Sequence, residues 1–117
     1  MPYVDGFVIP IKKKNLAAYR RISKAAGKIW KEYGALDYVE TAGDDLAPKG
    51  QFRKMTKVSA DETIVFSWIV YRSKAHRNAV NKKVIKDPRL EAMMNGRDMP
   101  FDVKRMAYGG FKVIVQQ

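Results

Sequence analysis

The chain has 117 residues, of which 46% are hydrophobic and 30% are charged, and its formal net charge is +11. This composition is typical of one globular domain that buries about two-thirds of its unfolded surface. The sequence contains no cysteine, which excludes a disulfide framework and thiolate chemistry. It also shows no apolar run near ~20 residues and no signal-peptide core, so we expect a single cytoplasmic domain over residues 1–117, without membrane association.

The first predicted element is a strand over residues 1–11, where side chains alternate in the period of two that a strand requires. We expect Pro10 to end this strand. Asp5 shares a face with apolar neighbours, and a buried carboxylate without a partner is costly. Asp5 therefore either lies partly in water near the strand end or lines a cavity.

A long amphipathic helix follows over residues 16–33, because apolar side chains recur there at helical spacing and Gly34 is a typical helix stop. Residues 36–41 then predict a second strand. Its alternation places Tyr38 and Glu40 on the same face.

The middle of the chain combines a basic loop with the most apolar strand. Residues 44–60 contain Pro, Gly and many charges with little periodicity, which predicts a long loop. Residues 63–71 (TIVFSWIVY) are rich in β-branched and aromatic side chains on both faces. A strand of this kind is central in a sheet, with both faces covered. Trp68 belongs to one of these faces.

A second helix is predicted from Ser73, as N-cap, to about Lys86. Its first turn carries His76, the only histidine, on the side that we expect to face the sheet. The last strand is predicted over residues 105–115, and the glycine pair at 109–110 indicates a bulge or the close approach of another backbone.

Between this helix and the last strand, residues 89–95 predict a short helix. Residues 96–104 predict an ordered loop in which Met99, Pro100 and Phe101 serve as apolar anchors.

The order strand, helix, strand, strand, helix, strand defines an α+β fold of the ferredoxin-like β-α-β-β-α-β type. Right-handed crossovers place the first and third strands at the centre of a four-stranded antiparallel sheet. Both helices then cover one face. The other face is also apolar and the single chain has nothing left to cover it, which predicts a homodimer that packs sheet against sheet.

The sequence lacks the usual signatures of cofactor and metal chemistry. It contains no phosphate-binding glycine loop and no GxSxG elbow, and one histidine without cysteine cannot form an ordinary zinc site. The acidic pairs at 44–45 and 61–62 are interpreted as loop charges. We therefore expect no cofactor and no metal.

Several polar and aromatic groups are predicted to converge between sheet and helices. Asp5 or Glu40 could orient His76 as a general base, and Arg105 could pair with an anionic substrate. The candidate catalytic residues are His76 and Asp5, and the candidate substrate-binding residues are Tyr38, Glu40, Trp68, Arg105 and Tyr108.

Four separate blocks carry a family resemblance across nearly the whole chain. They are YVDGFVIP (3–10), WKEYGALDYVE (30–40), ETIVFSWIVYRSKAHRNAVN (62–81) and MPFDVKRMAYGGF (99–111). Together they resemble the YbaA-like family of small bacterial proteins, whose defining domain is classed as of unknown function. No motif of this family is placed in the loop at residues 44–60.

The resemblance implies the dimeric α/β-barrel type of ferredoxin-like fold. Proteins of that wider superfamily include cofactor-independent monooxygenases, haem enzymes and small-molecule isomerases, and they commonly use a cavity between sheet and helices. The family supplies no catalytic residues to carry over, and a shared fold does not establish a function.

Three functional hypotheses remain open from the sequence. The first is a dimeric protein that binds or transforms a small organic molecule in a cavity between sheet and helices. The second is a nucleic-acid-binding module of the RNA-recognition type, which the charge of +11 favours and the third strand disfavours because it lacks the aromatic signature of that domain. The third is a non-catalytic dimeric interaction protein.

Overall fold

The computed structural model describes residues 1–94 and 99–117 of the chain. The strands are β1 (Tyr3–Lys12), β2 (Asp37–Ala42), β3 (Glu62–Tyr71) and β4 (Ala107–Lys112); the helices are α1 (Leu16–Glu32), α2 (Gln51–Thr56), α3 (Lys74–Ile85) and α4 (Pro88–Met94), with short 3-10 turns at Lys13–Asn15 and Val103–Arg105. The strands form one antiparallel sheet in the order β2-β3-β1-β4. The predicted ferredoxin-like topology is therefore confirmed.

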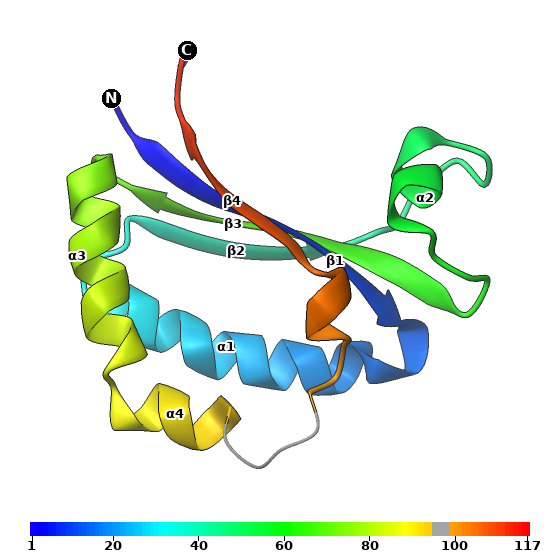
Figure 1. Ribbon diagram of the computed structural model, residues 1–117, viewed down its shortest axis with the longest axis horizontal. Coiled ribbons are helices and arrows are strands. Elements are labelled where there is room, and N and C mark those ends of the chain that lie inside the picture. Colours follow the sequence, from blue (N-terminus) through cyan, green and yellow to red (C-terminus); the bar gives the residue numbers. More distant parts are fainter. Residues whose placement is uncertain (95–98) are drawn as a thin grey trace.

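Helices α1, α3 and α4 lie together on one face of the sheet (Figure 1). On β3, the side chains that face them are almost fully buried, among them Val65, Ile69 and Tyr71. The alternate side chains of β3, such as Phe66 and Trp68, point to the opposite face. We call that opposite side the open face, because no long helix covers it. None of the described helices is long and apolar enough to cross a lipid bilayer.

The core on the helix side is divided into two clusters of buried side chains. One cluster lies against α3 and includes Ile69, Tyr71 and Val84. The other gathers where β1 meets the start of α1 and includes Ile11 and Tyr19. This division matters for function, because the cavity described below draws its walls from both clusters.

Pro10 does not end the first strand, contrary to the sequence prediction. It lies inside β1, opposite Ile64 of β3, and the strand continues to Lys12. Pairing with β4 covers only Tyr3 to Val8 of β1. The backbone at Pro10 thus has a neighbour on one side only, and proline is tolerated because no second strand requires its missing N–H.

The predicted long loop at residues 44–60 contains helix α2, which the sequence interpretation missed. Figure 1 shows α2 on the side of the sheet away from α1. Phe52 of α2 packs edge-on against Phe66, with the ring centroids 6.2 Å apart. A helix of six residues is too short to show a clear apolar periodicity in the sequence. The sequence therefore could not reveal that α2 contacts the open face.

The last strand is shorter than predicted and has no bulge. Pairing with β1 runs without interruption through Gly109 and Gly110, which lie opposite Gly6 and Asp5. The close approach at Gly110 comes from side chains, because a Cβ there would collide with Arg77 and Tyr3. The predicted short helix is α4, and residues 95–98 of the predicted helix and loop lie outside the described residues.

Candidate functional site

A cavity of about 140 Å³ lies between the sheet and the helices. Its walls are mostly apolar and aromatic, and they come from β1, α1, β2, β3, α4 and the residues before β4. Met99, Pro100 and Phe101, predicted as apolar anchors, contribute to it. The wall residues include Phe7, Ile9, Tyr19, Ile22, Ser23, Ala26, Trp30, Tyr38, Glu40, Ser67, Ile69, Leu90, Met94, Phe101 and Met106.

Glu40 is the single carboxylate in the described wall of this cavity. Tyr19 donates a hydrogen bond to its Oε1 at 2.7 Å, and Tyr38 donates to its Oε2 at 2.9 Å. Both partners are neutral phenols, so the charge of Glu40 is held in place without being neutralised. Ser67 lies opposite Glu40 in the sheet register and is also buried.

The two phenols remain hydrogen-bond donors at every physiological pH. Burial raises the pKa of Tyr19 far above its ordinary value, and the hydrogen bond to Glu40 raises it further. Burial followed by the charge of Glu40 does the same to the pKa of Tyr38. Since neither hydroxyl ionises, Glu40 stays an acceptor surrounded by donors.

The position of Tyr38 depends on a small residue in α1. A Cβ at Gly27 would lie 2.7 Å from the ring of Tyr38, so the ring rests directly on the helix backbone. Trp30 packs beside the same ring, with centroids 6.0 Å apart. Period-two alternation along β2 then turns Glu40 to the same side as Tyr38, as predicted from the sequence.

Asp5 lies in a separate polar network; it is near the start of β1, as one of the two predictions had it, but it is not in water. It is 1% exposed, and its Oδ1 lies 3.1 Å from Arg77 Nε in an ion pair. Asn81 donates to Asp5 Oδ2 at 3.2 Å. The Asn81 carbonyl in turn accepts from Trp30 at 3.0 Å and from Tyr71 at 3.1 Å.

His76 is not paired with either carboxylate that was predicted to orient it. Its Nδ1 accepts a hydrogen bond from the backbone N–H of Arg72 at 3.0 Å, and its own backbone N–H donates to the predicted cap Ser73 at 3.1 Å. The ring packs edge-on against Tyr71, as expected for a side chain facing the sheet. Burial and the nearby Arg72 lower the pKa of His76, so the neutral imidazole is favoured.

The remaining predicted residues lie apart from Glu40. Arg105 donates to Glu62 Oε2 at 2.6 Å at one end of β3. Trp68 borders the cavity as well as the open face, where its ring centroid is 5.9 Å from that of Phe66. Tyr108 stacks on Phe7 at 4.9 Å and is half exposed. Of the seven predicted side chains, the structure unites Tyr38 with Glu40 and places the others around different partners.

Sequence reasoning missed the partners that define both polar clusters. Tyr19 lies in the amphipathic helix predicted over residues 16–33, but the sequence did not show that its hydroxyl reaches Glu40. Arg77 and Asn81 are four residues apart on α3, a spacing that places two side chains on one helix face. That spacing is a signal in the sequence, but it does not reveal that Asp5 lies opposite.

Comparison with solved structures shows the fold class of the protein. A NIPSNAP-family protein with unknown function from Agrobacterium tumefaciens strain C58 shares the fold with a TM-score of 0.63 and 14% identity, covering 96% of this chain and 87% of that one. A NIPSNAP-domain protein from Burkholderia xenovorans gives 0.60 and 16%, covering 95% and 93%. A structure described as a dimeric ferredoxin-like protein, from an uncultured marine organism, gives 0.55 and 13%, covering all of both chains. These likenesses place the protein among α+β proteins of ferredoxin-like fold.

The family is more specific than the fold. Residues 2–103 match the family described as "Protein of unknown function (DUF1428)". The proteins named "Uncharacterized protein YbaA" from Escherichia coli strain K12 and from Shigella flexneri are each 44% identical over 120 residues, covering all of both chains. The chain therefore belongs to this family, and the resemblance drawn from the sequence is confirmed.

Proposed function

We propose that this protein is a homodimer whose subunits each bind a small organic molecule with an uncharged, hydroxylated ring beside Glu40. The observation that carries the proposal is a carboxylate held by two neutral phenols in the wall of an otherwise apolar cavity. A structural carboxylate is normally neutralised by a cation, as Asp5 is by Arg77. Among the described residues, the hydrogen-bond partners of Glu40 are both neutral, which leaves its charge available to a ligand.

The size of the cavity limits the ligand to about one ring. A buried apolar cavity of about 150 Å³ is known to hold benzene, and this cavity measures about 140 Å³. The aromatic walls, which include Phe7, Trp30 and Phe101, favour a flat ring through offset and edge-on contacts.

The chemistry of Glu40 selects a hydrogen-bond donor. A carboxylate can accept about four hydrogen bonds, and the two tyrosine hydroxyls supply two. A ligand hydroxyl can supply a third. A ligand cation would also suit the carboxylate, but the net charge of +11 repels cations from the protein as a whole. A neutral phenol or ring alcohol satisfies both conditions. Asp5 and His76 have no catalytic role in this proposal, because Asp5 is paired with Arg77 and His76 accepts a hydrogen bond from the Arg72 backbone rather than pairing with Asp5 or Glu40 in the described part of the chain.

The test is a titration with phenol. Binding is measured by calorimetry and by the change in fluorescence of Trp30, which lies in the cavity wall. The native protein should bind phenol, and Glu40→Gln should bind it at least tenfold more weakly, because hydrogen bonds to a charged acceptor are the stronger ones. Asp37→Asn, an exposed carboxylate on the same strand, is the control and should bind as the native protein does. Absence of phenol binding, or equal binding by Glu40→Gln, would refute the site.

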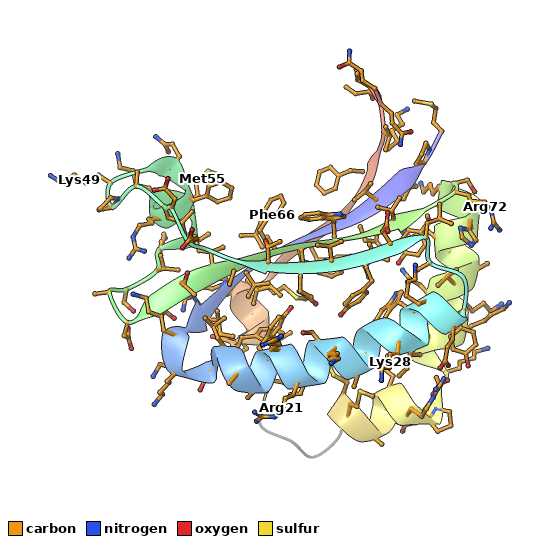
Figure 2. All side chains as sticks on the ribbon, turned by 180° about the vertical axis from the view of Figure 1, so that it is seen from behind. Arg21, Lys28, Lys49, Met55, Phe66 and Arg72 are labelled. Atoms are coloured by element: carbon orange, nitrogen blue, oxygen red, sulfur yellow. The ribbon has the colours of Figure 1, made fainter. Side chains whose placement is uncertain are left out.

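The homodimer is supported by the exposed apolar side chains of the open face. Phe66 is 46% exposed, Phe111 is 61% exposed and Ile114 is 81% exposed. Figure 2 shows Phe66 rising from the sheet on the side away from α1. Together with Trp68 these side chains line a hollow of about 1000 Å³, and the ring of Phe111 lies over Gly6 and Gly109 in its floor. An apolar surface of this kind marks an interface, and one protein of the same fold is described as dimeric.

Light scattering tests the dimer directly. The native protein should show twice the chain mass across a tenfold concentration range. Phe66→Glu and Phe111→Glu should each give a monomer, since each would bury an unpaired charge in the interface. Ile85→Glu, which changes an exposed apolar residue of α3 instead, should leave the dimer intact. A monomeric native protein would refute this part of the proposal.

A second candidate function uses the same face. Exposed rings at Phe66 and Phe111, next to Trp68, are suited to stacking nucleobases, and the charge of +11 suits phosphates. Stacking requires a free sheet, so this function and the dimer exclude each other. Binding of a single-stranded oligonucleotide that weakens steeply with salt, by a monomer, would favour it.

A further inference from the structure

A second hollow of about 550 Å³ lies outside the cavity, between α1 and the edge strand β2. Four cations from one side of α1 line it, spaced four, four and three residues apart: Arg20, Lys24, Lys28 and Lys31. We call it the basic groove. Lys28 is labelled on α1 in Figure 2.

The cations of the basic groove are not equally engaged. Lys31 donates to the backbone carbonyl of Leu36 at 2.6 Å. Lys28 lies near Glu32, which is itself paired with Arg89 at 2.6 Å. Within residues 1–94 and 99–117, the side chains of Arg20 and Lys24 make no hydrogen bond and no ion pair. Four cations and two carboxylates, Glu32 and Glu40, thus line the groove, and two of the cations have no direct partner among the described residues.

The basic groove and the cavity share part of their walls. Ser23, Tyr38 and Glu40 line both hollows. On the α1 side, this shared wall is formed by the small side chain of Ser23. The hydroxyl of a ligand in the cavity and a substituent in the groove are thus separated by a single layer of side chains.

We propose that the natural ligand is an organic monoanion, in which a neutral hydroxylated ring occupies the cavity and a carboxylate reaches the basic groove beside Arg20 and Lys24. This inference rests on the proposed function and names the class of its ligand. The cavity and the basic groove bind different parts of this ligand. Glu40 accepts a hydrogen bond from the ligand hydroxyl, and the cations Arg20 and Lys24 attract the ligand carboxylate.

The experiment compares two probes that differ only in charge and that carry the side chain next to the hydroxyl: 3-(2-hydroxyphenyl)propanoate and its primary amide. The acid should bind about fivefold more tightly at low salt, the gain expected from two exposed cations. The difference should shrink as salt is added, since the groove is open to solvent. In the Arg20→Gln, Lys24→Gln double variant the acid should lose its advantage while the amide binds as before.

A matched control separates a local effect from that of net charge. Lys82→Gln with Lys83→Gln removes the same two charges from exposed positions of α3 and should leave the fivefold preference intact. Equal binding of acid and amide, or a preference that survives in the Arg20, Lys24 variant, would overturn this inference alone if phenol still binds. Failure of phenol itself to bind the native protein would overturn the proposed function and this inference together.

Discussion

Asp5 and Glu40 are two carboxylates on the same face of one sheet, and they have opposite surroundings. Asp5 is 1% exposed and is held by the cation Arg77 and the amide of Asn81. Glu40 is half-buried, is held by two phenols and borders two hollows. Strand alternation placed both on the helix side, so position alone does not separate them.

This difference indicates that the charge of the hydrogen-bonding partner determines whether a carboxylate on this face stabilises the core or can bind a ligand. A cation neutralises the charge and ties it into the core, here through Asn81 to Trp30 and Tyr71. Phenols hold the carboxylate in position without neutralising its charge. We therefore propose that Asp5 contributes to stability and Glu40 to ligand binding, and the following variants test this proposal.

The largest effect is expected at Asp5. Asp5→Ala removes the partner of Arg77 and one partner of Asn81, so the free energy of unfolding should fall by about 3 kcal/mol. Asp5→Asn keeps an acceptor and should cost less. Guanidinium denaturation measures both. A loss below about 1 kcal/mol in Asp5→Ala would contradict a structural role.

Gly27→Ala tests the wall of the cavity. Alanine gains about 1 kcal/mol in helix propensity, but its Cβ would meet the ring of Tyr38 at 2.7 Å. Overpacking costs about 1–3 kcal/mol. The sum predicts a net loss of about 1 kcal/mol together with weaker binding of phenol. If Gly27→Ala stabilises the protein instead, the ring of Tyr38 moves freely and the wall is not fixed.

Tyr38→Phe should have a smaller effect on stability, about 1 kcal/mol, the usual value of one hydrogen bond. Tyr33→Phe is its matched control, because Tyr33 also donates to a carboxylate, Asp87, at 2.7 Å. Both variants should lose similar stability by thermal unfolding. Only Tyr38→Phe should weaken phenol binding severalfold, since it frees Glu40 to leave its position. An equal loss of phenol affinity in both variants would contradict a specific role of Tyr38 in the binding site.

The smallest effect concerns a third carboxylate, which also has a cation partner. Hydrogen bonds from Arg105 and from the backbone of Ser59 lower the pKa of Glu62 from 4.5 to about 2. Because the folded-state pKa is the lower one, this contribution is present above about pH 4.5 and is lost as the pH falls toward 2. The gain is modest, as the Arg105 side chain is 34% exposed.

Acid unfolding curves measure this contribution. Glu62→Gln should flatten the fall in stability between pH 4.5 and 2 and should leave phenol binding at pH 7 unchanged. A variant with the native acid response would place the titrating group elsewhere.

Much of the fold follows from short-range patterns. The two-residue period of β1 and β3 and the helical period of α1 were enough to predict the element order, and the apolar side chains on both faces of β3 identified it as central. Patterns of this range could not show what a single side chain meets across the sheet. Pro10 is tolerated because β4 stops short of it, and Gly110 is required because Arg77 and Tyr3 fill its place.

The candidate site was predictable in part for the same reason. Alternation in β2 paired Tyr38 with Glu40 correctly. The third member, Tyr19, comes from α1, where an aromatic stripe has the same spacing whether its hydroxyls are satisfied by water or by a carboxylate. Arg105 looked available for an anion until its distance to Glu62 was known.

The edge strand β4 has a consequence for local motion. It pairs only with β1, and most of its six residues are exposed. Such a strand can detach without unfolding the sheet, so its amide hydrogens should exchange with solvent before those of β1 and β3. Phe111 on β4 lines the hollow that a second subunit would fill. Slowing of this exchange with rising protein concentration would therefore report assembly at the level of single backbone amides.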